Sequence, residues 1–194
     1  MTFEGYRAFN DPYVYNGTSV LKNKLKTRDA AALTVFEIEM TAVRAAEPPP
    51  TGRFGPAHFR AVHRHLFQDV YSWAGHYRTV RTGKSGNWFC YPEHIPREME
   101  RVFGDLRRNE YLAGRSFGDF AHGAASFLAD LNAIHPFRDG NGRAQLTFLG
   151  LATVKAGHSI DLGRIQPEEF LRAMILSFSG DVGALTRQIV SLRT

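Results

Sequence analysis

The densest group of reactive side chains occupies nine residues, His135-Pro136-Phe137-Arg138-Asp139-Gly140-Asn141-Gly142-Arg143. Histidine is the side chain whose pKa suits proton transfer near neutral pH. The two glycines remove side chains and so let a ligand approach the backbone closely. The segment lies between two stretches of apolar helical pattern, which makes it an interhelical loop. Its residue types predict acid–base chemistry beside a bound ligand.

The ligand expected at this loop is a phosphate. Arg143 stands in the first turn of a predicted helix, where free N–H groups and the helix dipole attract an anion. Its guanidinium can fork onto phosphate oxygens, and Asn141 can donate from its side-chain amide. Asp139 would repel phosphate unless a cation lay between them, which favours Mg²⁺. The alternative is a glycine-rich turn with a structural histidine, but the density of functional groups argues against it.

Helices must position this loop. Apolar residues at helical spacing, together with start and stop signals, predict helices over most of the chain. The expected ranges are 27–46 with Thr27 as N-cap, 56–70, 96–109, 117–134, 143–156, a helix beginning near Gln166-Pro167, and 182–192. A short amphipathic turn or helix is expected over Thr18–Leu25. The helix over 143–156 is apolar on most sides, which places it at the centre of the fold.

One β-hairpin is expected beside these helices. Its strands are predicted at Tyr77–Thr82 and Trp88–Tyr91, around a turn at Gly83–Asn87. A lone hairpin is only marginally stable in water, so it must pack against the helices. The fold class is therefore all-α with one small hairpin. We expect a single domain over residues 1–194, with its core at about 11–190.

Composition narrows the classes of function. Cys90 is the single cysteine of the 194 residues, so no intrachain disulfide can form. Neither a signal peptide nor a membrane-spanning stretch is recognisable, so we expect a cytoplasmic protein, although secretion by a specialised system stays open. The net charge of +5 is scattered along the chain, which does not favour nucleic-acid binding. His63, His65 and His76 form no recognised set of metal ligands.

The loop resembles the signature of Fic-domain proteins, H-x-F-x-[D/E]-G-N-G-R, and matches it at every specified position. Three further stretches extend the resemblance to nearly the whole chain. Residues 11–15 and 21–25 are similar to the N-terminal part of bacterial Fic toxins and related secreted effectors. Residues 63–75 are similar to the helix that leads to the family's hairpin.

The resemblance implies a protein adenylyltransferase. In that reaction His135 takes the proton from a Ser, Thr or Tyr hydroxyl of a target protein. The oxygen then attacks the α-phosphorus of ATP, and pyrophosphate leaves with Mg²⁺. The implied ligand contacts are the metal for Asp139, the α-phosphate for Gly140, Asn141 and Gly142, and the β-phosphate for Arg143.

The hairpin resembles the family's flap, which holds a target segment by pairing with it as an added strand. Lys84 and Phe89 are the flap residues for which the resemblance implies a role. Trp88 is a third candidate, with hairpin packing as the equal alternative. Phe137 is expected to point into the core and anchor the loop.

The chain departs from the family at Leu146, where the longer signature R-x-x-R has a second arginine. In the family that arginine contacts the terminal phosphates and receives an inhibitory glutamate. Leucine removes a bidentate phosphate contact, so the identity of the nucleotide stays open. No Ser or Thr has Glu four residues later, as the inhibitory motif requires. An inhibitor is therefore expected on a separate small protein, as in the toxin–antitoxin class.

The resemblance offers several targets and activities. Toxins of this type modify type II topoisomerase subunits, and secreted relatives modify host GTPases; the short chain favours the former. Transfer of a different nucleotide or of phosphocholine is an alternative, whereas intact Gly140–Gly142 argues against phosphorylation. A catalytically silent module that presents its hairpin edge is a further alternative. Intact His135 and Asp139 argue against it, and Leu146 argues weakly for it.

Overall fold

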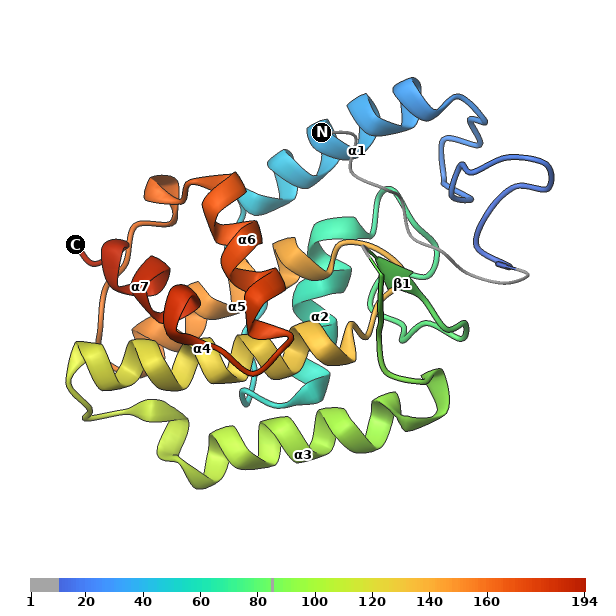
Figure 1. The fold of residues 1–194 in the computed structure, drawn as a ribbon. Coiled ribbons are helices and arrows are strands. Elements are labelled where there is room, and N and C mark those ends of the chain that lie inside the picture. Colours follow the sequence, from blue (N-terminus) through green and yellow to red (C-terminus); the bar gives the residue numbers. More distant parts are fainter. Residues whose placement is uncertain (1–10, 85) are drawn as a thin grey trace.

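The computed structural model describes residues 11–84 and 86–194, and it is largely helical (Figure 1). The α-helices of this part are α1 (Ala30–Ala45), α2 (Pro56–Phe67), α3 (Ile95–Arg108), α4 (Phe117–Ile134), α5 (Asn141–Lys155), α6 (Pro167–Ser177) and α7 (Gly183–Ser191). Short 3-10 turns lie at Pro92–His94, Glu110–Leu112 and Leu162–Arg164. The two strands are β1 (Gly83–Lys84) and β2 (Asn87–Trp88). The all-α class with one small hairpin is thus confirmed.

Helix α4 begins and ends where the sequence predicts. Ser116 caps it by accepting a hydrogen bond from the backbone N–H of Asp119 at 3.2 Å. The predicted cap of α1, Thr27, is wrong by two residues. Asp29 is the cap, because its carboxylate accepts from the N–H groups of Ala31 and Ala32. The hydroxyl of Thr27 instead accepts from the N–H of Asp29 at 3.1 Å, in the turn before the helix.

The helical alternative for residues 18–25 is wrong. Val14 and Leu21 form an antiparallel bridge, and the N–H of Tyr15 donates to the carbonyl of Val20 at 3.0 Å. Gly17 allows the reversal because its φ is 75°. The apolar residues of this segment therefore reach the core from a folded-back loop rather than from a helix.

The hairpin exists, but it is shifted toward the predicted turn: β1 lies wholly within Gly83–Asn87, and β2 overlaps the predicted return strand only at Trp88. Strands β1 and β2 are antiparallel, with Gly83 opposite Trp88 and Lys84 opposite Asn87. Of residues 77–82, predicted as the first strand, Thr82 still pairs across the hairpin, where its carbonyl accepts from the N–H of Phe89 at 3.1 Å, but Arg78 is tied to the α4–α5 loop. The N–H of Arg78 donates to the carbonyl of Pro136 at 2.9 Å. This segment uses its backbone for a contact distant in sequence, which local propensity does not reveal.

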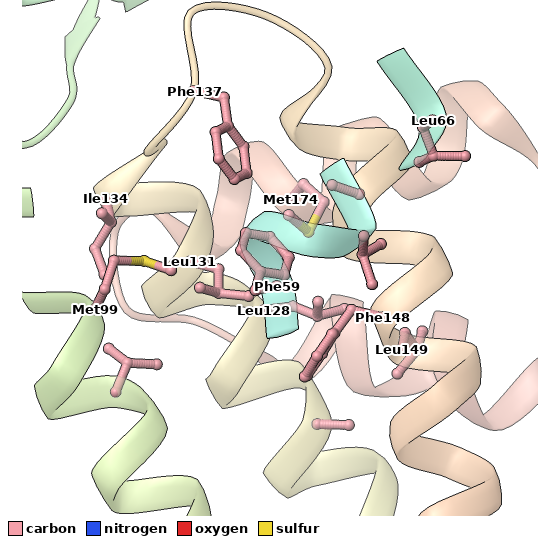
Figure 2. Packing of buried hydrophobic residues seen from close by; sticks show 14 of the residues in the cluster. Phe59, Leu66, Met99, Leu128, Leu131, Ile134, Phe137, Phe148, Leu149 and Met174 are labelled. Atoms are coloured by element: carbon pink, nitrogen blue, oxygen red, sulfur yellow. The ribbon is translucent and has the colours of Figure 1, made fainter. Parts of the chain in front are cut away.

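The core gathers around α4, which packs against α3, α5, α6 and α7. Three phenylalanines, Phe59, Phe137 and Phe148, are fully buried at its centre (Figure 2). The rings of Phe59 and Phe148 meet edge to face with centroids 5.5 Å apart, a favourable geometry. Helix α5 was predicted as the central helix, but Val154 is 74% exposed, so one side of α5 faces solvent. Among the described helices, none has the length and apolar character needed to cross a membrane.

Candidate active site

The nine-residue signature forms the loop between α4 and α5 and the first turn of α5. His135 ends α4 in the left-handed conformation, with φ 49° and ψ 63°. Gly140 precedes α5 with φ 77°. Asn141 closes the loop, because its amide donates to the carbonyl of Phe137 at 2.8 Å and its Oδ1 accepts from the N–H of Phe137 at 3.0 Å. The side-chain amide that was expected to donate to phosphate is therefore engaged within the loop.

Phe137 anchors the loop as expected, and it does so against a histidine. Its buried ring stacks on His63, with centroids 3.8 Å apart. The N–H of Gly75 donates to Nδ1 of His63, so Nε2 carries the proton and donates to the carbonyl of Asp139 at 2.9 Å. Burial lowers the pKa of His63 to about 3, which keeps the ring neutral. His63 is therefore a structural support of the loop.

The buried side chain of Arg78 connects the α4–α5 loop to the hairpin. Its side chain is 2% exposed, and its guanidinium donates to four backbone carbonyls. Two of these carbonyls belong to Ile134 and His135, and the others to Val80 and Cys90. A buried guanidinium with fixed acceptors resists rearrangement. Arg78 thus holds His135 and the hairpin in a fixed relative position.

The ring of His135 stacks on the ring of Phe89, with centroids 3.8 Å apart and an interplanar angle of 8°. Burial, and next the positive charge of Arg78, lower the pKa of His135 to about 3. The imidazole is consequently neutral at physiological pH, which is the form that can accept a proton. The stacking fixes the plane in which it can do so.

His135 opens into a cavity of about 350 Å³ between the hairpin, α5 and α6. Apolar side chains make up most of its wall. The lining residues are Lys84, Asn87, Phe89, Asn132, His135, Gly142, Gln145, Leu146, Ile165, Pro167, Phe170, Leu171, Met174, Ile175 and Phe178. An apolar cavity with a few polar groups is typical of a small-molecule site.

The two glycines of the loop serve different purposes. A Cβ on Gly140 would lie 2.4 Å from the ring of Phe67, so this glycine is required by packing as well as by its positive φ. A Cβ on Gly142 would meet no described atom within 4 Å. Gly142 lies in the first turn of α5, where backbone N–H groups have no intrahelical partner. Packing alone thus explains Gly140, whereas the open space at Gly142 is where the expected close approach of a ligand meets no steric obstacle.

Arg143 is held beside this helix N-terminus by groups from α1 and α2. Its Nη2 lies 2.7 Å from Oε1 of Glu37, and its guanidinium lies 4.5 Å from the centroid of the Phe67 ring. The second oxygen of Glu37 accepts a hydrogen bond from the hydroxyl of Tyr71. One guanidinium nitrogen serves the ion pair, and the remaining N–H donors can serve a phosphate.

Asp139 lies close to the same groups. Its Oδ1 accepts from the N–H of Gly140 at 2.5 Å. Burial, and next the negative charge of Glu37, raise the pKa of Asp139. The described residues contain no cluster of three or more side chains that could bind a metal by themselves. Mg²⁺ needs no such cluster, since it keeps several waters and binds through one or two carboxylates plus substrate phosphates. Asp139, beside the α5 N-terminus, fits that mode of binding.

Two of the three expected flap residues line the cavity, and the third does not. Lys84 and Phe89 line the cavity beside His135. Trp88 is 42% exposed and does not line it, and its ring lies 5.0 Å from the guanidinium carbon of Arg81. The packing interpretation of Trp88 is therefore supported by its contact with Arg81, whereas Lys84 and Phe89 lie in the cavity wall.

Sequence reasoning missed Glu37, His63 and Arg78. A signal existed for the first two. Glu37 falls four residues after buried Leu33 on α1, and His63 falls four residues after buried Phe59 on α2, so each polar side chain interrupts an apolar stripe. Arg78 gave no such signal, because its acceptors are carbonyls distant in sequence.

Comparison with known proteins identifies the family. The sequence model of the Fic/DOC family matches residues 53–152. The chain is 51% identical, over 95% of its length and 96% of the relative, to a probable protein adenylyltransferase, y4lH, of Sinorhizobium fredii. It is 35% identical, over 90% of its length and 88% of the relative, to the probable protein adenylyltransferase Fic of Escherichia coli.

Solved structures agree with these sequence relatives. The BepC protein of Bartonella tribocorum, with bound AMPPNP, has a TM-score of 0.84 and 28% identity, covering 94% of this chain and 96% of that one. A Fic domain of Bartonella quintana, with bound ADP, has a TM-score of 0.85 and 29% identity, covering 94% of each chain. The loop geometry, the matching family model and these relatives together show that the chain belongs to the Fic/DOC family.

Proposed function

We propose that this chain transfers AMP from ATP to a Ser, Thr or Tyr hydroxyl of a target protein. One observation carries the proposal: His135 and Gly142, which lies in the first turn of α5, line the same cavity. A general base and an anion site are thereby within reach of one ligand. Relatives named as protein adenylyltransferases, and similar structures with bound AMPPNP and ADP, support the choice of nucleotide.

In the proposed reaction the neutral imidazole of His135 accepts the proton of the target hydroxyl. The hydroxyl oxygen forms a bond to the α-phosphorus as the bond from that phosphorus to the bridging oxygen breaks. Pyrophosphate leaves with the electron pair of the broken bond. The backbone N–H groups at Gly142 and Arg143 offset the charge on the transferred phosphate. Mg²⁺, held by Asp139, supplies further charge neutralisation when bound.

The remaining parts of the cavity suit the rest of the substrates. The apolar wall on α6 can enclose the nucleoside, and Lys84 on the hairpin can contact the target segment that pairs with it. The free N–H donors of Arg143 can bind the β-phosphate. The hairpin can pair with an extended target segment through its edge, as strand addition does elsewhere.

The biological setting is part of the same proposal. We infer a cytoplasmic toxin that a separate small antitoxin protein inhibits, because the chain lacks the inhibitory sequence motif. A type II topoisomerase subunit is the proposed target class. Direct binding of nucleic acid is not part of the proposal.

One observation favours a second candidate function. Leu146 lines the cavity where the family signature has its second arginine. A site with less positive charge could take a donor other than ATP, such as another nucleotide or a phosphocholine donor. In either case His135 would keep its role as the base.

A donor panel tests the proposal. The protein would be incubated with bacterial lysate and with ATP labelled on the α- or the γ-phosphate, other nucleoside triphosphates, or labelled CDP-choline. We expect protein labelling from α-labelled ATP alone. Labelling from the γ-phosphate would indicate phosphorylation, and labelling from CDP-choline would establish the second candidate. Labelling from no donor would support a silent binding module.

A further inference from the structure

Gln145 is a buried amide in the wall of the cavity. It lies on α5 one turn after Gly142 and is 3% exposed. It lines the cavity together with its neighbour Leu146. Within the part of the chain that the structure describes, its Nε2 has no hydrogen-bond partner. Buried amides are normally paired, because an unpaired one loses its bonds to water without compensation.

A second amide in the same wall shows the usual arrangement. Asn132 on α4 also lines the cavity, but its Nδ2 donates to the carbonyl of Met174 at 3.1 Å. Asn132 therefore holds α4 to α6. The Nε2 of Gln145 has no such partner among the described residues, although Gln145 lines the same cavity. A partner for Gln145 must come from whatever enters the cavity.

The position of Gln145 along α5 indicates which part of a ligand it meets. The anion site lies at the first turn, at Gly142. Three residues further along the helix is a displacement of roughly 4.5 Å at ~1.5 Å per residue. That displacement leads away from the phosphates and into the apolar part of the cavity. A ligand atom there belongs to the nucleoside.

We propose that Gln145 binds the nucleobase and selects adenine, an inference that rests on the proposed transfer of AMP from ATP. A carboxamide presents a donor beside an acceptor. Adenine presents the complementary pair, a ring nitrogen that accepts and an N6 amino group that donates, which is why glutamine and adenine pair with two hydrogen bonds. A half-turn about the last side-chain bond exchanges the two ends of the amide. The apolar wall excludes water from this pair and so increases its effect on selectivity.

Calorimetry with three ligands tests this role. The ligands are ATP, the triphosphate of purine riboside, which lacks the N6 amino group, and inorganic tripolyphosphate, which lacks the nucleoside. The variant is Gln145→Leu, which keeps an apolar side chain of similar size. Val154→Ala, on the exposed side of the same helix, is the control. Thermal melting of each variant establishes that it folds.

We expect Gln145→Leu to weaken ATP binding about tenfold, as the loss of a pair of neutral hydrogen bonds predicts. Binding of tripolyphosphate should stay unchanged, and the purine riboside analogue should lose less than ATP. Val154→Ala should match the wild type with all three ligands. The proposal is overturned if Gln145→Leu binds ATP like the wild type, or if it loses tripolyphosphate to the same extent.

The wild-type protein separates this inference from the proposed function. If the wild type binds ATP no better than tripolyphosphate, the base is not recognised, and the role of Gln145 is wrong while the phosphate site stands. If the wild type binds neither ligand, the proposed function itself is wrong, and the role of Gln145 falls with it.

Discussion

At the scale of single residues, the neighbouring carboxylates of Asp139 and Glu37 should make the proposed phosphate site sensitive to pH. Burial raises the pKa of Asp139, and the charge of Glu37 raises it further. Only the ionised carboxylate binds Mg²⁺, so magnesium-dependent nucleotide binding should fail, as the pH falls, at a higher pH than an ordinary aspartate would cause. The charge of Glu37 thus raises the pH below which magnesium-dependent nucleotide binding is lost.

Glu37→Gln should lower the pH at which magnesium-dependent nucleotide binding is lost. Glutamine keeps an oxygen that can accept from Arg143 but removes the negative charge, so the pKa of Asp139 falls. Magnesium-dependent ATP binding should then persist to lower pH, as calorimetry over a pH series would measure. Glu39→Gln, an exposed change on the same helix, is the control. Identical pH midpoints for wild type and Glu37→Gln would show that Glu37 does not act on Asp139.

Asp139→Ala should weaken nucleotide binding only when Mg²⁺ is present. The carboxylate can meet phosphates favourably only through a cation, so its loss should remove the benefit of the metal. ATP titrations with Mg²⁺ and with EDTA, on both proteins, would measure that benefit. The same magnesium dependence in the two proteins would mean that the cation is bound elsewhere.

At the scale of secondary structure, helix α5 lacks the second arginine of the family signature. Leu146 takes that position, and the nearest cation further along α5 is Lys155, nine residues on. That spacing is ~13 Å along a helix. The ammonium of Lys155 lies 5.3 Å from the centroid of the Tyr111 ring. Helix α5 therefore offers no replacement for the missing guanidinium.

We expect the wild type to bind ATP little more tightly than ADP. Leu146→Arg should strengthen ATP binding by ~1.5–3 kcal/mol, the usual contribution of a hydrogen bond to a charged group, and ADP binding by less. The increase in ATP affinity will be smaller if the apolar wall strains the new arginine side chain. Leu146→Met, which changes the packing without adding charge, is therefore the control. Calorimetry with both nucleotides decides. If the wild type already prefers ATP strongly, another cation holds the γ-phosphate, and Lys84 in the cavity wall is the first candidate.

The helices were predictable because their apolar stripes and caps are local. Helix α4 was correct at both ends, since Phe117 begins an apolar stripe and Ser116 caps it. The first strand was misplaced because the backbone of Arg78 bonds to Pro136 in the α4–α5 loop, a contact that no local pattern encodes. The N-cap of α1 was misplaced because Thr27 and Asp29 are both good caps, and only the helix geometry selects between them.

At the scale of the whole molecule, the site is assembled from segments distant in sequence. The sequence revealed the reactive loop because its residues are contiguous. It did not reveal Glu37 from α1, His63 from α2 or Arg78 before the hairpin, since their contacts form only after the chain folds. Arg138 extends this assembly to the start of the described chain, with its Nε 2.7 Å from Oδ2 of Asp11 in a buried ion pair. The residues that sequence patterns missed were thus those whose partners lie far away in the sequence.

The central claim is that His135 deprotonates a protein hydroxyl that then attacks the α-phosphorus of ATP. Its most direct test compares wild type and His135→Ala, both for transfer of label from α-labelled ATP to lysate protein and for ATP affinity by calorimetry. We predict that His135→Ala lowers the transfer rate by ~10²–10⁴-fold, the usual contribution of a general base, and changes ATP affinity by no more than a few-fold. Full labelling by His135→Ala would contradict the account.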